Sequence, residues 1–418
     1  MNDALPTLIH ADGVVLGDGA PIRDGAVLVA SDGEVLDVGE AASLVPRHGG
    51  AKVERVHGVV FPGLVNAHTH IELSAMRGRV PGGKGFVVWL DAFVGARTEV
   101  DADEEESAVE QAVRDLDGFA TAAVGDVSNR LTAVRALARH GIGGSVFHEV
   151  FGAREDTLRK AVVALASARE TVVGAWPTKD LAYAVAPHTL YTTHPSVLRE
   201  LVAEAAKHPF PTTLHLAEHA AERRALETAD GPVVEWMLAA TKGGSADFPW
   251  PKLAPIAYAD ALGALGPHIL SVHLTDLHQD EVDLLRKRHA SIVLCPRSNL
   301  YIELKLPPLT MMRDAGLEPA LGTDSLASNA SLDVLAEARA LHDRFPGIPA
   351  RDLLQMATWN GARVLKRPDL GRIAKGSKPG LALVKGELGA ADPCAFLLAH
   401  VKAPRTWIAT RRVEGGLS

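Results

Sequence analysis

The chain of 418 residues has little cysteine and no long apolar run, and each absence excludes a class of protein. Its two cysteines, Cys295 and Cys394, are too few for a disulfide scaffold or a zinc ribbon. No apolar run approaches the ~18 residues that a membrane-spanning helix needs. The first residues also lack the basic segment and apolar core of a secretory signal. We therefore expect a cytoplasmic protein without a membrane partner.

Basic residues are also in the minority, with 43 Lys and Arg against 51 Asp and Glu and a formal net charge of −8. A dedicated nucleic-acid binder is usually basic, so we expect no nucleic-acid partner. An apolar fraction of 47% excludes a disordered chain. The length predicts two or three domains, or one large barrel with a smaller domain beside it.

The middle of the chain, from about residue 100 to 345, alternates helical segments with short apolar runs. An earlier run of the same kind, VVFPGLVNAH at 59–68, brings the number of runs to eight. Eight buried strands separated by helices predict an α/β protein built on a (β/α)8 TIM barrel. The later runs lie at 121–127, 143–151, 181–188, 212–219, 268–276, 291–299 and 318–325.

The sequence pattern at both ends of the chain is typical of β-strands. Residues 1 to about 60 contain β-branched runs broken by Asp-Gly turns, and strand-like runs return after about 365 in GRIAKGSKPGLALV, CAFLLAHV and TWIATRRVEGG. We predict a small composite β-sandwich domain from residues 1–60 and 365–418, beside a barrel of residues 61–364. The Gly- and Pro-rich segment 241–255 interrupts a βα unit and is either a lid or a surface insertion.

Histidine is abundant, at 18 residues, and several histidines close the apolar runs. In a barrel the carboxyl ends of the strands meet at one mouth, so residues distant in sequence converge there. Alternate strand residues point the same way, so the pair in NAHTH can hold one ion. Three imidazoles and one carboxylate suit a single Zn²⁺, with Fe²⁺ as a substitute. The predicted ligands of this divalent metal ion are His68, His70, His215 and Asp324.

Glu218 follows His215 in the string HLAEH, which also matches the His-x-x-Glu-His pattern of zinc proteases. That pattern requires a helix, whereas here it follows the strand start Pro-Thr-Thr-Leu. We therefore interpret Glu218 as a proton shuttle beside a metal ligand.

The motifs FPGLVNAHTH, APHTLY, LHLAEH, SVHLTD, CPRSN and LGTDSLASN, with GRIAKGSKPGLALV in the tail, resemble those of the amidohydrolase superfamily over nearly the whole chain. The resemblance implies a barrel that carries a β-sandwich made from both termini. The fourth run, LAYAVAPH, lacks the lysine that bridges two metals in dinuclear members, which implies a mononuclear site.

Within the superfamily, the chain is similar to the deaminase branch. HTHIELSA, HLAEHAAERRAL and VHLTDLHQDEVDLL most resemble aminodeoxyfutalosine deaminases of the menaquinone pathway, with S-adenosylhomocysteine and adenosine deaminases as relatives. The resemblance implies hydrolytic deamination of a small-molecule nucleoside, in which Glu218, His273 and Asp324 are catalytic. Open alternatives are another amidine-like ring, such as guanine, cytosine or a triazine, and a non-catalytic scaffold. A homodimer is an open alternative to a monomer.

The substrate contacts are predicted from position. His188 resembles the family position that meets a sugar hydroxyl, and Glu72, near the mouth, could bind ribose or a base edge. Glu149 is a weaker candidate, and Arg77 and Arg79 are either carboxylate contacts or surface charges. Asn299 and Ser325 are expected to brace the site.

Overall fold

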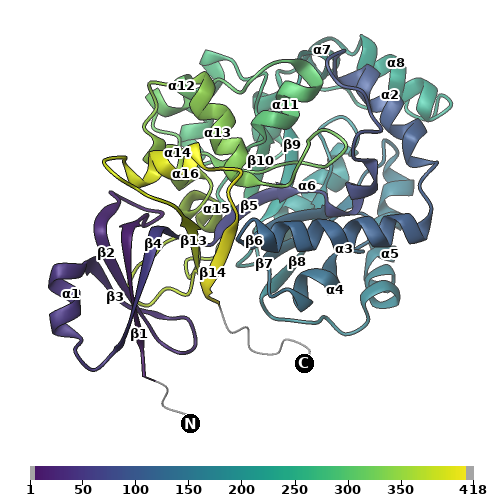
Figure 1. Ribbon diagram of the computed structural model, residues 1–418. Coiled ribbons are helices and arrows are strands. Elements are labelled where there is room, and N and C mark those ends of the chain that lie inside the picture. Colours follow the sequence, from purple (N-terminus) through teal and green to yellow (C-terminus); the bar gives the residue numbers. More distant parts are fainter. Residues whose placement is uncertain (1–4, 411–418) are drawn as a thin grey trace.

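The computed structural model describes residues 5–410, which form three β-sheets and the helices around them (Figure 1). The first sheet takes strands from both ends of the chain, in the order β14-β13-β4-β1-β2-β3. Its strands are β1 (Thr7–Val14), β2 (Ile22–Val29), β3 (Val35–Glu40), β4 (Lys52–Pro62), β13 (Leu381–Lys385) and β14 (Arg405–Ala409).

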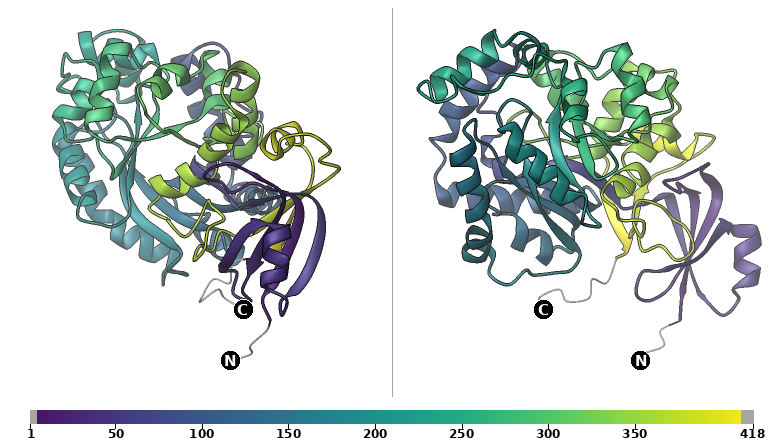
Figure 2. Two further views of the ribbon diagram at one scale, coloured as in Figure 1. Left: turned by 90° about the vertical axis from the view of Figure 1, so that its left-hand side faces the viewer. Right: turned by 180° about the vertical axis from the view of Figure 1, so that it is seen from behind.

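This terminal sheet is antiparallel except where β1 pairs with β4. Helix α1 (Ala41–Arg47) packs beside β2 and β3 at its outer end (Figure 2). One continuous sheet thus joins the two predicted terminal segments, while the second layer of a sandwich stays a prediction. Residues 1–4 and 411–418 of the predicted domain lie outside the described residues.

The other two sheets have four strands each and are wholly parallel. One runs β5-β6-β7-β8 and the other β12-β11-β10-β9. Isolated parallel bridges, Thr69 to Asp324 and Thr189 to His215, join them at both edges. Their strands are β5 (Leu64–Thr69), β6 (Thr121–Ser128), β7 (Gly143–Val150), β8 (Leu181–Pro187), β9 (Thr212–Leu216), β10 (Ile269–His273), β11 (Ser291–Leu294) and β12 (Ala320–Leu321).

Helices separate these strands along the chain and lie outside them (Figures 1 and 2). No helix within residues 5–410 combines the length and apolar character needed to cross a membrane. The remaining helices are α2 (Phe86–Arg97), α3 (Ala102–Gly118), α4 (Val134–Arg139), α5 (Glu155–Val173), α6 (Pro195–Ala205), α7 (Ala220–Thr228), α8 (Pro232–Ala240), α9 (Pro255–Ala261), α10 (Val282–Lys287), α11 (Pro296–Glu303), α12 (Leu309–Asp314), α13 (Val334–Arg344), α14 (Ala350–Met356), α15 (Trp359–Val364) and α16 (Pro393–Ala399), with 3-10 turns η1 (Ile71–Met76) and η2 (Gln279–Glu281).

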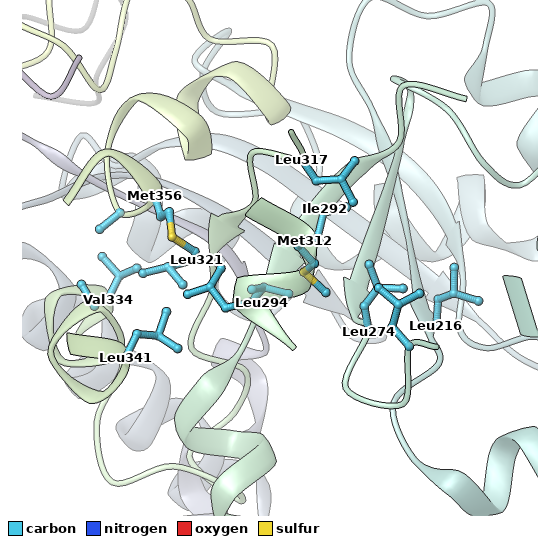
Figure 3. Packing of buried hydrophobic residues seen from close by; sticks show 14 of the residues in the cluster. Leu216, Leu274, Ile292, Leu294, Met312, Leu317, Leu321, Val334, Leu341 and Met356 are labelled. Atoms are coloured by element: carbon cyan, nitrogen blue, oxygen red, sulfur yellow. The ribbon is translucent and has the colours of Figure 1, made fainter. Parts of the chain in front are cut away.

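The largest apolar core lies between the second parallel sheet and its helices. Figure 3 shows Leu216 and Leu274 at the ends of β9 and β10 on one side, and Val334 and Leu341 of α13 on the other. Close packing of this kind gives each strand end one position relative to its neighbours. That fixed position is what a site assembled from several strand ends requires.

The run VVFPGLVNAH, predicted as one strand, is two strands in different sheets: β4 ends at Pro62, and β5 begins at Leu64. A side chain at Gly63 would meet Ala122 and the Pro379 carbonyl, each at 2.6 Å, so only glycine lets the chain pass between the sheets here.

The prediction that the run CAFLLAHV forms a strand is wrong. These residues lie in helix α16 and its C-terminal flank. Asp392 caps the helix by accepting from the backbone N–H groups of Cys394 and Ala395, and Pro393 occupies the first turn. A short apolar run does not by itself distinguish a buried helix from a strand.

Candidate metal centre and active site

The polar residues singled out in the sequence lie at the carboxyl ends of the parallel strands. His68 lies in β5 and His70 directly follows it, while His215 lies in β9 and His273 ends β10. Asp324 follows β12 and pairs with Thr69 through a parallel bridge. The fold therefore brings residues separated by more than 250 positions in sequence, such as Thr69 and Asp324, to one place.

Three histidines of this group can hold a metal ion. His68, His70 and His215 each offer a ring nitrogen, and these atoms lie within 4.8 Å of one another. The Nε2 atoms of His70 and His215 are only 3.3 Å apart. Both ring nitrogens of His68 are buried without a hydrogen-bond partner, which is costly unless a cation accepts a lone pair. The residues therefore fit a bound metal ion.

The protonation of these histidines also suits ligation. Burial, reinforced by the neighbouring histidines, holds the pKa of His68 well below its ordinary value. Burial lowers the pKa of His70 to about 3. His215 Nδ1 lies 3.0 Å from the carbonyl oxygen of His188 and donates to it, which leaves the Nε2 lone pair free. Neutral imidazole is the form that binds a metal.

Asp324 lies beside the histidines, with Oδ1 3.6 Å from His70 Nε2. Its Oδ2 accepts from Ser298 Oγ at 2.6 Å and from Ser328 Oγ at 3.1 Å. Its Oδ1 accepts from the backbone N–H of Ser325 at 2.8 Å. These bonds fix the orientation of the carboxylate. Ser325 thus lies where it was expected to brace the site.

Glu218 follows β9 and is buried next to His273, with 3.7 Å between Oε1 and His273 Nε2. Burial, together with the charges of Asp324 and Glu222, raises the pKa of Glu218 well above its ordinary value. The other ring nitrogen of His273 lies 3.2 Å from the amide nitrogen of Asn299, which was expected to brace the site. A carboxyl group whose pKa is raised above its ordinary value is suited to carry a proton in acid–base chemistry.

The protease interpretation fails on local geometry. His215 lies in strand β9, and His219 is the N-cap of α7, so the two histidines of HLAEH share no helical face. The side chain of His219 instead accepts from the backbone N–H of Glu222 and stacks on Phe86.

A cavity of about 780 Å³ opens over the group. His70, His215, Glu218, His273 and Asp324 form its polar base. Its walls are largely apolar and come from α2, α8, the segment after α8 and the end of β7: Phe86, Trp89, Phe93, Phe151, Trp236, Met237, Thr241 and Gly244. A base of this kind beneath apolar walls is typical of a small-molecule site.

Of the predicted substrate contacts, some line the cavity and one does not. His188 lines the cavity, and its Nδ1 lies 2.7 Å from Thr192 Oγ1. Glu149 also lines it, and burial raises its pKa to about 7. Glu72 is not on the cavity wall, because its buried carboxylate accepts from Ser128 Oγ and from the backbone N–H groups of residues 129 and 130. The structure therefore gives no support to Glu72 as a substrate contact.

The two arginines after the metal motif do not line the cavity. Arg77 pairs with Asp115 at 3.2 Å, and Arg79 pairs with Glu104, so both serve as surface charges. Sequence reasoning instead missed Arg97 and Arg154, which do line it. For Arg97, the sequence offered one signal. The segment FVVWLDAFVGAR has aromatic residues at helical spacing and forms the helix that ends with Arg97.

Comparison with known proteins agrees with this geometry. Residues 59–410 match the model of the amidohydrolase family, and the chain belongs to that family. An aminodeoxyfutalosine deaminase of Deinococcus radiodurans is 29% identical over 370 residues, covering 86% of this chain and 85% of the relative. A 5-methylthioadenosine/S-adenosylhomocysteine deaminase of Halobacterium salinarum is 31% identical over 408 residues, covering 94% and 88%.

Solved structures share the fold. The crystal structure of Helicobacter pylori aminofutalosine deaminase in complex with methylthio-coformycin has a TM-score of 0.83 at 22% identity, covering 96% of this chain and 97% of that one. An adenosine deaminase from Xanthomonas campestris with bound zinc has a TM-score of 0.75 at 23% identity, covering 99% and 94%. At this level of identity the likeness concerns the fold alone.

Proposed function

We propose that the protein is a metal-dependent hydrolytic deaminase of an adenine nucleoside, with aminodeoxyfutalosine as its substrate. The observation that carries the proposal is the convergence of three histidine nitrogens, with Asp324 and Glu218 beside them, at the base of one large cavity. The two curated relatives, which are named for deamination of nucleosides, support the choice of reaction. This substrate would place the enzyme in menaquinone biosynthesis, and methylthioadenosine or S-adenosylhomocysteine is the alternative.

We infer that the two parallel sheets together form the predicted (β/α)8 barrel over residues 61–364. The eight strands, the helices between them and the bridges at both sheet edges support this inference. We also retain the composite β-sandwich of residues 1–60 and 365–418 as a proposal, supported by the sheet that joins both termini.

The residues that would hold one divalent ion are His68, His70, His215 and Asp324, a set that suits Zn²⁺ and also accommodates Fe²⁺. A bound ion of this kind would lower the pKa of water towards ~7 and so supply a nucleophile at neutral pH.

Glu218 would carry the proton in this reaction. Its carboxylate accepts a proton from the attacking water and delivers it to the ring nitrogen beside the carbon that bears the amino group. Water adds its oxygen to that carbon, the C–N bond to the amino group breaks, and a second proton leaves with ammonia. The raised pKa of Glu218 favours the protonated form that the delivery step needs.

His273 and Asp324 would orient the water. The amide nitrogen of Asn299 faces His273 Nδ1, so that Nε2 carries the proton and donates towards the reacting centre. Asp324 accepts a hydrogen bond from the nucleophile. His188, on the cavity wall, would meet a sugar hydroxyl.

The decisive variant is Glu218→Gln, which removes the proton carrier without changing its size. We expect turnover to fall by at least ~10²-fold while bound metal per chain stays unchanged. Glu204→Gln, on the exposed face of α6, is the matched control and should retain wild-type turnover. Near-normal turnover in Glu218→Gln would exclude the assigned role.

An ammonia-release screen tests the substrate. Aminodeoxyfutalosine, methylthioadenosine, S-adenosylhomocysteine, adenosine, guanine and cytosine are supplied to the metal-loaded enzyme, and product and ammonia are quantified together. Futalosine with ammonia in equal amounts supports the proposal. Inertness to every adenine nucleoside together with activity on another ring overturns it. Inertness to all, with far less than one metal per chain, favours a non-catalytic scaffold.

A further inference from the structure

Two consecutive residues of α7, Glu222 and Arg223, place buried charged groups against the turns that follow β9 and β10. Those two turns carry Glu218 and directly follow His273. Neither Glu222 nor Arg223 lines the cavity. The contacts of Glu222 and Arg223 therefore hold the two turns in place and do not bind the substrate.

The carboxylate of Glu222 binds the turn after β9 through two backbone groups. Oε1 accepts from the N–H of Ala217 at 3.1 Å, and Oε2 accepts from the N–H of Glu218 at 2.8 Å. In an ordinary capping box, a glutamate at this helix position accepts from the N-cap residue itself. Here the N-cap is His219, and Glu222 reaches one and two residues further back.

The turn needs such a restraint because Ala217 has φ +49°, in the left-handed region that residues with a side chain disfavour. This conformation sets the direction in which the next side chain, that of Glu218, leaves the backbone. Both oxygens of Glu222 are used, so one group determines the placement of two successive peptide units.

Arg223 holds the second turn against the first. Its Nε donates to Asp276 Oδ2 at 2.7 Å, and its Nη2 donates to the Asp276 carbonyl at 2.6 Å. The N–H of Asp276 in turn donates to the Ala217 carbonyl at 2.8 Å. The turns that carry Glu218 and follow His273 are thus tied to each other and to the start of α7.

We propose that Glu222 is a positioning residue for the deamination: by accepting from both peptide N–H groups, its carboxylate holds the turn that aims Glu218 at the reacting centre. The inference rests on the proposed function. A glutamine at 222 keeps the size but offers one acceptor oxygen, and its NH₂ group would face the second N–H. The positioning role therefore requires a carboxylate that accepts from the N–H groups of both Ala217 and Glu218.

The test is Glu222→Gln in the full-length, metal-loaded enzyme, with Glu227→Gln on the same helix as the matched control. A misplacement of about 1 Å costs ~10²-fold in rate, so we expect kcat to fall by roughly that factor. KM should stay within about threefold, since the substrate-binding walls are untouched. Bound metal per chain should stay at the wild-type level, and Glu227→Gln should match the wild type throughout.

A folded Glu222→Gln enzyme with kcat within about twofold of the wild type would overturn the proposal. A fall in kcat that merely follows a loss of bound metal or of folded protein would overturn it too. If this variant is not recovered folded, Glu222→Asp replaces it. The shorter carboxylate keeps the charge but cannot span both N–H groups, so a reduced kcat with unchanged KM is expected and wild-type kcat contradicts the proposal.

Glu218→Gln, measured in parallel, separates this proposal from the one on which it rests. If Glu218→Gln remains active, the proton role of Glu218 is wrong whatever position 222 does. If Glu218→Gln is inactive and Glu222→Gln is fully active, only the positioning role fails.

Discussion

Arg405 joins the last strand of the terminal sheet to the ends of three helices, α3, α13 and α16, and its replacement tests how strongly that junction stabilises the protein. Nη1 and Nη2 donate to the two carboxylate oxygens of Asp333, each at 2.7 Å. They also donate to the carbonyls of Phe119 and Val401, each at 2.9 Å. The side chains of Arg405 and Asp333 are only 2% and 7% exposed.

The expected cost follows from this burial. Removing one partner of a buried ion pair leaves the other charge uncompensated and costs ~3–5 kcal/mol. In Arg405→Ala, Asp333 would keep only its cap to the backbone N–H of Leu335 at 3.0 Å. We therefore expect the free energy of unfolding to fall by ~3–5 kcal/mol. Arg405→Lys keeps the charge but loses the planar fork, so it should lose less.

Urea unfolding of the metal-loaded protein measures this change, followed by circular dichroism and tryptophan fluorescence. The two transitions must coincide for the free energies to be valid. Asp283→Asn is the control, since it removes an exposed pair with Arg286 and should change stability by less than ~0.5 kcal/mol. A loss below ~1 kcal/mol in Arg405→Ala would refute the reasoning from burial.

Three further changes have expected outcomes. Ser298→Ala removes a hydrogen bond that orients Asp324 and should weaken metal binding by ~10–100-fold, as measured by competition with a chelator. Leu294→Ala should lower the free energy of unfolding by ~2–5 kcal/mol, because Leu294 is fully buried in the core of Figure 3. Burial raises the pKa of Glu337 to about 8 from an ordinary 4.5, so the folded protein holds a proton that the unfolded chain has released. This group should therefore make stability fall as pH rises from about 4.5 to about 8, and Glu337→Gln should flatten that fall in unfolding curves taken across the range.

Much of the site could be predicted because strand ends in a parallel sheet converge by geometry alone. A histidine pair at positions i and i+2 at the end of one strand, together with polar residues at the ends of two other strands, has few arrangements to adopt once the strands are parallel. His68, His70, His215 and Asp324 lie together for that reason.

The surroundings of Glu72 and the helical conformation of the C-terminal run could not be predicted locally, because their partners lie far away in sequence. Glu72 stands two residues after a predicted ligand, yet its carboxylate accepts from residues 128–130, at the end of another strand. CAFLLAHV is apolar except for His400, and α16, which contains most of it, packs against α13 and α14. Neither contact leaves a local trace in the sequence. The aromatic wall of the cavity was missed for the same reason, since Phe86 and Trp236 come from helices far apart in the chain.

The direction of the proposed catalytic side chains depends on backbone conformations that sequence patterns do not indicate. Ala217, His273 and Asp324 all have positive φ, at 49°, 79° and 58°, although none is glycine. Each such residue costs ~1–2 kcal/mol, so the surrounding structure must hold it. The N–H groups of Thr323 and Asp324 both donate to the His68 carbonyl, at 2.9 and 3.1 Å, while Glu222 and Asp276 hold Ala217. Backbone strain is thus concentrated at the three turns that carry Glu218, His273 and Asp324. Hydrogen bonds from neighbouring strands and helices hold these turns in place. A site whose groups must point at one reacting atom requires turns that are fixed in this way.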